Sequence, residues 1–310
     1  MRTAFINWLC QKAKEDPSLI LLTADLGYSV VEPFAELYPG CFFNIGVAEQ
    51  NMVGIAAGLA SEGFRPYTYS IGIFPTFRCA EQLRNDIDYH QLPVVTCSVG
   101  SGVTYGALGY THHMIQDLAL MRSLPAMLMA TPADPVEVEA ILDWHFLHPC
   151  PLYLRLHKAG DPIVHNHRPL ELQPGKWLLI YQPRPDLPPL EENCCVVVVG
   201  ALAPAVVAIL SELRASIPAF SCPLWGQPTT STTATELQRF QRIFTVEDHL
   251  LPGGFGSWLL ELSASWACDT RIRPITLPAN SVGAVASEAT LLAPLLEEFR
   301  QQMLPFSQGI

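Results

Sequence analysis

Short apolar runs alternate along the chain with longer stretches in which apolar residues recur every three or four positions. The runs have the length of buried strands, and the longer stretches have the spacing of helices that pack on a sheet. Strands that alternate with helices are typical of doubly wound, mostly parallel α/β folds. The helices expected in the first half are 3–14, 47–61, 77–88, 117–121 and 135–145, and the expected strands are 19–23, 42–45, 67–73, 93–99, 126–130 and 152–156.

The last part of the chain repeats this alternation on a smaller scale. Between the two parts, residues 160–192 contain seven prolines, and we expect a connector with a β-hairpin-like middle there. The sequence thus predicts two mostly parallel α/β domains, at 1–159 and 193–310, joined by this connector. The elements expected in the second domain are strands at 195–200, 242–246 and 272–277 and helices at 204–216 and 256–267.

Composition narrows the class of protein. A chain of 310 residues that is 49% hydrophobic is long enough for two buried cores. Only 15% of the residues are charged, which indicates that part of the surface is buried against other chains. The net charge of −11, without a basic cluster, disfavours a nucleic-acid or anionic-membrane partner. No apolar run has the length of a membrane span, and the nine cysteines form no C-x-x-C pair, so we expect reduced thiols and a cytoplasmic location.

Segment 43–52, Phe-Asn-Ile-Gly-Val-Ala-Glu-Gln-Asn-Met, carries a single charge, Glu49, in apolar and glycine-bearing surroundings. Burying a carboxylate without a partner is costly, so its presence here requires a reason. A carboxyl group in a dry site has a raised pKa and can share a proton with a ligand nitrogen. The other interpretation is structural, because an acid in the first turn of a helix is stabilised by the helix dipole.

A glycine-rich loop at 100–114 follows the expected strand 93–99 and contains Thr111-His112-His113. Open α/β sheets bind ligands at the carboxyl ends of their strands, where such a loop lies. The alternatives to a ligand-binding role are an exposed polar tip and a metal site. Adjacent histidines seldom chelate one ion, and no third ligand stands at zinc spacing, so we expect no metal ligands.

Segment 43–52 resembles the cofactor-activating motif of the transketolase family of thiamine diphosphate enzymes. The resemblance implies that Glu49 binds N1′ of the aminopyrimidine ring and drives it toward its imino tautomer, which then deprotonates the thiazolium carbon. The spacing Gly109-x-Thr111-His112 is similar to the family's active-site loop. This implies that His112 reaches the substrate's hydroxyl groups and carbonyl oxygen, with His113 assisting.

Residues 71–85 resemble the family segment that walls the aminopyrimidine ring. The resemblance implies that Phe74, Phe77 and Arg78 contact the cofactor, and aromatic faces suit a flat heterocycle. Phe77 fits a core position as well, since it has strand-to-helix spacing from its neighbours.

Asp25, Leu26 and Ser29 resemble the first-strand loop that meets cofactor and substrate in the family, although Asp25 could equally cap a helix. Leu108 stands where family members that act on sugar phosphates often carry an acid, which reads a hydroxyl group beside the ketose carbonyl. The replacement implies a sugar with fewer hydroxyl groups or a different configuration.

Arg122 and Lys158 stand where related enzymes place basic residues for a substrate phosphate. Lys158 would bind phosphate as a point charge, without the bidentate fork of the arginine that is common there. The alternative for Arg122 is a salt bridge to Asp117 or Glu81.

The family holds the cofactor's diphosphate through Mg²⁺ with a Gly-Asp-Gly motif followed by an asparagine. The nearest approach, 160–162 with Asn193, lacks the second glycine and lies in the proline-rich connector, not at the strand, turn and helix that such a motif needs. The resemblance therefore implies the C-terminal subunit of a split transketolase acting on sugars. A separate N-terminal subunit would supply the diphosphate and Mg²⁺ site in an α2β2 assembly.

Two alternative functions stay open. The β subunit of a 2-oxoacid dehydrogenase has the same domain order and its own activating glutamate, but residues 111–113 and 119–125 favour transketolase. A neighbouring gene for a lipoyl acyltransferase would favour the dehydrogenase. A non-catalytic regulatory subunit is expected to lose its buried acid first, whereas Glu49 and His112 are both present.

Overall fold

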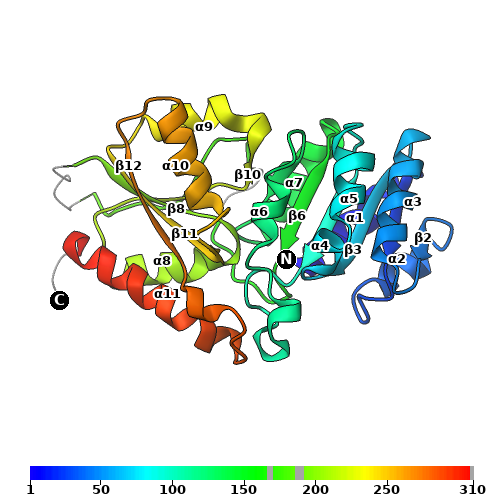
Figure 1. Cartoon of the computed structure of the whole chain (residues 1–310), viewed down its shortest axis with the longest axis horizontal. Coiled ribbons are helices and arrows are strands. Elements are labelled where there is room, and N and C mark those ends of the chain that lie inside the picture. The colour runs from blue at the N-terminus through cyan, green and yellow to red at the C-terminus, as the bar shows by residue number, and fades with distance from the viewer. Residues whose placement is uncertain (166–169, 186–191, 308–310) are drawn as a thin grey trace.

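Two sheets lie side by side, and helices cover both faces of each (Figure 1). This structure is a computed structural model, and it describes residues 1–165, 170–185 and 192–307. In both sheets the central strands run parallel. Among the described strands, antiparallel pairing occurs only where β10 (Leu224–Trp225) meets β5 (Leu128–Ala130) and where β7 (Leu178–Tyr181) meets β9 (Ala219–Ser221). The expected α/β fold class is therefore confirmed.

The first sheet has seven strands in the order β10-β5-β6-β4-β3-β1-β2. The central strands of such a sheet are buried on both faces, so their sequences are continuous apolar runs. The apolar runs noted in the sequence are these strands. The strands are β1 (Leu19–Thr23), β2 (Phe42–Asn44), β3 (Arg65–Ile71), β4 (Val95–Val99), β5 (Leu128–Ala130), β6 (Leu152–Leu156) and β10 (Leu224–Trp225).

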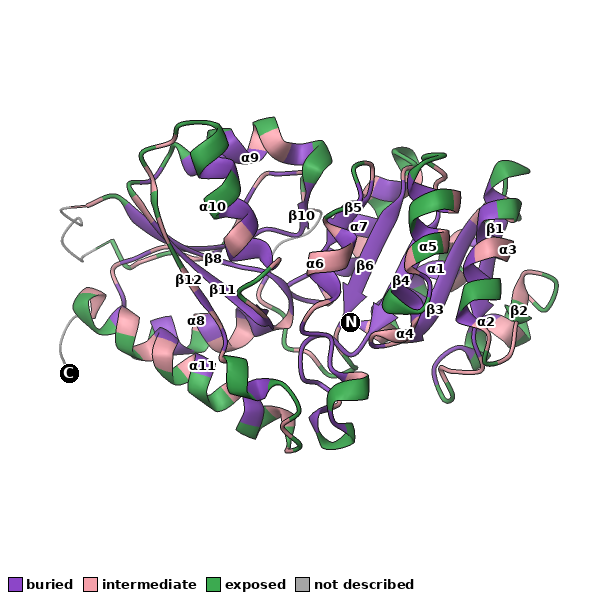
Figure 2. Ribbon diagram, in the orientation of Figure 1, coloured by how far each residue is buried: buried purple, intermediate pink, exposed green. Residues whose placement is uncertain are grey.

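Helices on the two faces of the first sheet bury separate apolar clusters. Helices α1 and α7 cover one face, and α3, the π-helical turn Leu83–Asp88 and α6 cover the other. Apart from the edge strand β2, the strands of this sheet are almost wholly buried, whereas the helices keep an exposed side (Figure 2). The helices are α1 (Arg2–Lys12), α2 (Glu32–Leu37), α3 (Glu49–Ser61), α4 (Phe74–Phe77), α5 (Ala80–Gln82), α6 (Asp117–Met121) and α7 (Pro135–Leu147).

The second sheet has five strands in the order β12-β11-β8-β9-β7. Helices α8 and α11 cover one face, and α9 and α10 cover the other (Figure 1). Its elements are β7 (Leu178–Tyr181), β8 (Cys194–Val198), α8 (Ala203–Glu212), β9 (Ala219–Ser221), α9 (Thr230–Leu237), β11 (Arg242–Leu250), α10 (Phe255–Ser265), β12 (Arg271–Leu277) and α11 (Glu288–Met303).

The short strand β10 joins the second half of the chain to the first sheet. Leu224 pairs with Ala130 and Trp225 with Met129 in antiparallel register. Trp225 is fully buried, and its indole N–H donates to the Thr131 hydroxyl group at 2.9 Å. One apolar cluster runs from α3 through Trp225 to α10, so the two sheets share a core.

The expected β-hairpin in the middle of 160–192 is wrong for the described residues. The described part of this stretch contains β7, which pairs antiparallel with β9 and so belongs to the second sheet. Burial of Trp177 against Phe220 and Phe240 explains why β7 docks there. The prolines at 169, 188 and 189 lie outside the described residues. The domain boundaries 1–159 and 193–310 stay predictions.

The expected helix 77–88 is broken into α4, α5 and a π-helical turn. π-Helical turns inside helices occur frequently at functional sites. None of the described helices combines the length and the apolar character needed to cross a bilayer.

Candidate active site

The carboxyl ends of β1, β3 and β4 lie at one edge of the first sheet, because these strands are parallel neighbours. Three segments follow them: 24–31, 72–78 and 100–114, the last of which we call the histidine loop. Most of the expected site residues lie on these segments.

Glu49 is the first residue of α3 and is 3% exposed. Gly46, just before the helix, has a left-handed φ of 75°, which glycine adopts without steric cost. Oε2 of Glu49 accepts a hydrogen bond of 3.0 Å from Nη1 of Arg78. Both interpretations of this acid fit its position, since it lies in the first turn of a helix and is also buried beside a cation.

Phe74, Arg78 and His112 lie in contact beside Glu49. The Arg78 guanidinium carbon is 4.1 Å from the centre of the Phe74 ring, and the Phe74 and His112 rings meet edge-on at 5.3 Å. Gly72 permits this approach, because a Cβ there would lie 3.1 Å from the His112 carbonyl oxygen, and its φ of 54° is left-handed. The structure thus brings these four expected residues into one group.

Two members of the group, Glu49 and Arg78, border a cavity of about 490 Å³. Phe77, on the same segment as Arg78, is 50% exposed, so its interpretation as a core residue is wrong. The cavity is lined by Val47, Ala48, Glu49, Gln50, Asn51 and Arg78.

His112 is suited to donate a hydrogen bond. Burial, and then the neighbouring His113 and Arg78, lower the pKa of His112, so its imidazole is neutral at neutral pH. Nδ1 lies 3.0 Å from the Thr111 hydroxyl oxygen, and a hydroxyl group that donates there leaves the ring proton on Nε2. A neutral, preorganised N–H donor can stabilise negative charge that develops on a substrate oxygen.

His113 points into the protein. It is 1% exposed, its Nε2 lies 3.4 Å from the Gly106 carbonyl oxygen, and its Nδ1 has no hydrogen-bond partner among the described residues. The ring is therefore buried beneath the loop surface, and its assistance at the substrate stays a prediction. Leu108 is 59% exposed, and the adjacent Gly109 approaches Val285, which lies before α11 and is 66% exposed.

Asp25 and Ser29 have left-handed backbone, with φ of 55° and 62°. Such conformations are strained for residues other than glycine and cluster at functional sites. Asn44 holds the turn: its Oδ1 accepts from the Asp25 N–H at 3.0 Å, and its Nδ2 donates to Asp25 Oδ1 at 3.1 Å. Val31 is the N-cap of α2, so Asp25 caps no helix there, and Leu26 is half-buried. Asn44 was not among the predicted site residues, although a polar residue at the end of an apolar strand is a signal for one.

Arg122 and Lys158 are engaged by carboxylates from the second half of the chain. Arg122 donates to the two carboxylate oxygens of Glu261 at 2.9 and 2.7 Å. Nζ of Lys158 donates to Glu288 at 2.8 Å. A salt bridge of Arg122 therefore exists, with a different partner from those expected. The positions of these two cations lend no support to the expected phosphate contacts.

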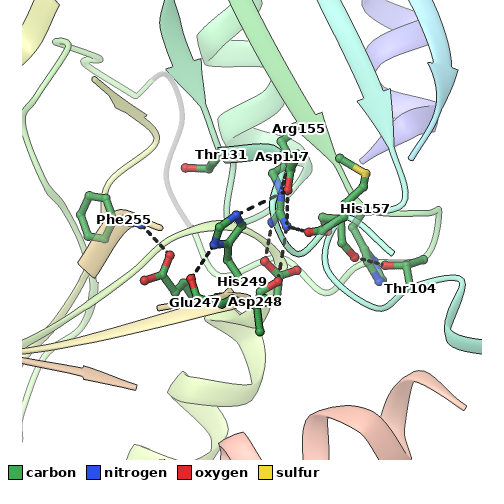
Figure 3. A network of polar contacts seen from close by, with 12 residues as sticks. Thr104, Asp117, Thr131, Arg155, His157, Glu247, Asp248, His249 and Phe255 are labelled. Atoms are coloured by element: carbon green, nitrogen blue, oxygen red, sulfur yellow. Dashed lines mark hydrogen bonds and ion pairs between the residues drawn. The ribbon is translucent and has the colours of Figure 1, made fainter. Parts of the chain in front are cut away.

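A buried ion network joins the two halves beneath the histidine loop (Figure 3). Arg155, which is 2% exposed on β6, donates to Asp117 at 2.8 Å and pairs with Asp248. It also donates to the Met114 carbonyl oxygen in the loop. Gly102 packs so closely on Asp248 that no side chain would fit. The network therefore holds both ends of the histidine loop in place. In the sequence, the only sign of this network is an arginine inside an apolar strand.

Glu288, the first residue of α11, forms a second anchor for the histidine loop. It accepts from the Thr104 hydroxyl group at 3.2 Å, from His157 at 2.6 Å and from Lys158 at 2.8 Å. Despite the opposing effect of burial, hydrogen bonds from His157 and Lys158 lower the pKa of Glu288 to about 2. Burial likewise opposes the charge on His157, but hydrogen bonds with Asp161 and Glu288 raise its pKa to about 9.

We expect His157 to make the stability of the protein fall in mildly alkaline solution. The folded state keeps a proton that the unfolded chain releases above about pH 6.5. The stabilisation is therefore complete below that pH and is lost as the pH rises through about 9. This raised pKa corresponds to roughly 3 kcal/mol. Urea unfolding at about pH 6 and about pH 9.5 measures the difference.

His157→Gln should remove most of that difference, because the variant has no titrating group between the two carboxylates. His90→Gln is the matched control, since His90 is exposed and distant from Glu288 in sequence. An undiminished pH dependence in His157→Gln would show that other groups produce it.

Known proteins that resemble this chain are transketolases or related enzymes. Residues 1–160 match the model of the transketolase pyrimidine-binding domain. A putative transketolase C-terminal section from Methanocaldococcus jannaschii is 29% identical over 269 residues, which cover 86% of this chain and 82% of that protein. One subunit of the apulose-4-phosphate transketolase from Phocaeicola vulgatus is 35% identical over 176 residues, or 56% of each chain.

The chain also resembles part of a longer synthase and the whole of one solved structure. The 1-deoxy-D-xylulose-5-phosphate synthase of Anaeromyxobacter dehalogenans is 32% identical over 83% of this chain, which spans only 40% of that synthase. A structure described as a split gene transketolase, inactive β4 tetramer, superposes with a TM-score of 0.78 at 26% identity, covering 99% of this chain and 98% of the other. The chain therefore belongs to the transketolase family, to the section that begins with the pyrimidine-binding domain.

Proposed function

We propose that this chain is the C-terminal subunit of a two-chain, thiamine diphosphate-dependent transketolase, which transfers a two-carbon ketol unit from a ketose to an aldehyde. The observation that carries the proposal is the contact group at the edge of the first sheet. It joins a buried carboxylate, Glu49, to an aromatic face, Phe74, and a neutral N–H donor, His112.

These residues suit the aminopyrimidine half of the cofactor. A carboxylate that is 3% exposed can hold a proton at a ring nitrogen, and the half-buried Phe74 offers a face for a flat heterocycle. The bound cofactor would supply a carbanion at its thiazolium carbon, able to cleave the bond beside a ketose carbonyl. In this scheme Glu49 holds the proton at N1′, and Nε2 of His112 donates to the oxygen of the attacked carbonyl group.

The diphosphate half of the site belongs to a separate N-terminal subunit in this proposal. Within 1–165, 170–185 and 192–307, no group of three His, Cys, Asp or Glu side chains is arranged to hold a metal ion. The solved relative supports a two-chain enzyme, since it is described as a split gene transketolase and as an inactive β4 tetramer. An α2β2 assembly would place a diphosphate and Mg²⁺ site of the partner opposite Glu49.

The apolar residues beside His112 support a modified sugar as the substrate. Leu108, in the histidine loop, and Val285, which contacts the loop at Gly109, are both exposed, and an acid would be needed there to read an additional hydroxyl group. The name of the Phocaeicola relative, which belongs to an apulose-4-phosphate transketolase, supports an unusual sugar phosphate. We therefore expect a ketose that differs from the common pentose phosphates.

The 32% identity to the Anaeromyxobacter synthase favours a second candidate, the synthesis of 1-deoxy-D-xylulose 5-phosphate by a two-chain enzyme. The split-chain relatives favour ketol transfer, because they match this chain over most of their own length. Assays of the purified two-chain complex with ketose donors, and separately with pyruvate, distinguish the two reactions. A complex that is inactive in both assays would favour one of the two other functions, the 2-oxoacid dehydrogenase subunit or the regulatory subunit.

We expect the isolated chain to bind thiamine diphosphate weakly and to catalyse no ketol transfer. The reason is that its described residues offer the ring contacts of the cofactor but no diphosphate motif. The test is co-purification with the product of its genomic neighbour, followed by calorimetry and a ketol transfer assay with Mg²⁺. Tight, Mg²⁺-dependent binding by the isolated chain would refute the two-chain proposal.

A further inference from the structure

One guanidinium group touches both residues that the proposed function assigns to the aminopyrimidine ring. Nη1 of Arg78 donates to Oε2 of Glu49 at 3.0 Å. The same group lies over the Phe74 ring, with its central carbon 4.1 Å from the ring centre. Arg78 therefore lies between the acid and the aromatic face.

The chemistry of a guanidinium group resembles that of an aminopyrimidine protonated on its ring nitrogen. Each is planar, carries nitrogen donors that suit a carboxylate, and is attracted to the face of an aromatic ring. The two groups would make the same contacts, so a ring that stacks on the covered face of Phe74 and binds Oε2 of Glu49 must displace Arg78.

The side chain of Arg78 can move away from Glu49 and Phe74. Its side chain is 49% exposed, whereas that of Glu49 is 3% exposed, so the arginine can move into solvent while the acid stays in place. Arg78 also borders the cavity of about 490 Å³ that leads to Glu49. Its backbone continues the helical conformation of α4, with φ of −65° and ψ of −30°, so only the side chain needs to move.

We propose that Arg78 is a displaceable substitute for the aminopyrimidine ring. It neutralises the buried Glu49 and covers Phe74 until the ring replaces it at both. The inference rests on the proposed function, and it changes the role expected for Arg78 from a cofactor ligand to a competitor. A competing contact within the protein lowers the apparent affinity for the ring by the fraction of time that the site is closed.

The test measures binding of 4-amino-5-hydroxymethyl-2-methylpyrimidine, the aminopyrimidine moiety alone, to the full-length chain by ligand-detected NMR titration. In Arg78→Met, which keeps the length of the side chain but removes its charge and planar group, we expect the Kd to fall about tenfold, the scale of one lost ion pair and one lost cation–π contact. Arg84→Met is the matched control, because Arg84 lies in the π-helical turn that follows Arg78 and donates to Asn85 at 2.8 Å, away from Glu49 and Phe74. Its Kd should equal that of the wild type.

Arg78→Lys is a control for misfolding. It keeps a cation beside Glu49, which stabilises the buried carboxylate, but it lacks the planar group. We expect its Kd to lie between those of the wild type and Arg78→Met. Binding that depends on Glu49 but is unchanged or weaker in both Arg78 variants would overturn the inference and leave the proposed function intact. No binding by any of the proteins would overturn the inference, while ketol transfer by the two-chain complex tests the proposed function separately. Binding unaffected by Glu49→Gln would overturn both.

Discussion

Glu49→Gln should strongly slow deprotonation of the thiazolium carbon in the assembled two-chain complex. Glutamine keeps the size of the side chain and an acceptor for Arg78, but it cannot hold a proton at a ring nitrogen as a carboxyl group does. Loss of a general acid–base group slows its step by roughly 10²- to 10⁴-fold. Deuterium exchange at the thiazolium carbon of bound cofactor measures this step directly, and ketol transfer should fall with it.

Glu62→Gln is the control for this experiment. Glu62 is the C-cap of the same helix and is exposed, so its replacement makes the same chemical change at the opposite end of α3. Both variants should unfold at temperatures close to that of the wild type. Wild-type exchange in the Glu49→Gln complex would remove this residue from the mechanism.

His112→Ala should lower kcat by roughly 10², the scale of losing one preorganised donor to a developing oxyanion. The deletion removes the neutral imidazole that faces Phe74 and leaves the anchors of the histidine loop at Arg155 and Glu288 in place. His90→Ala, at an exposed position before β4, should keep full activity. A ketol transfer assay with a saturating donor sugar separates this effect on kcat from an effect on KM.

The same assay examines the substrate. We expect the complex to prefer deoxy or otherwise modified ketoses over xylulose 5-phosphate with ribose 5-phosphate. Efficient turnover of the common pair would refute the substrate proposal, while an unimpaired His112→Ala complex would refute the role of the histidine. The two conclusions are independent, because they depend on different residues of the loop.

The strands of the first sheet were predictable because buried parallel strands are continuous apolar runs. The expected strands 19–23 and 152–156 agree with β1 and β6 at both ends. Short elements escaped prediction: α2 has six residues and β10 has two, too few for a period to show. Helix α9 was missed because its sequence is rich in threonine and serine, which have low helix propensity.

The residues of the candidate site were predictable one by one, from motifs, but their mutual contacts were not. Phe74 and His112 follow the neighbouring strands β3 and β4, whereas Glu49 follows β2, which is separated from β3 by β1. The fold brings the three residues together. The partners of Arg122 and Lys158 come from α10 and α11, whose packing against the first half no local pattern specifies. The inward orientation of His113 depends in the same way on how the loop folds around Gly106.

The strand β10 has a consequence for how this chain folds and evolves. Proteins with two domains often unfold in separate steps, one domain after the other. Here the edge of the first sheet is completed by residues 224–225, and Trp225 lies in the core that both sheets share. The two halves should therefore lose their structure in a single cooperative transition. A gene split between these halves would place β10 on a different polypeptide from the sheet that it completes. Selection should therefore keep the two halves on one polypeptide.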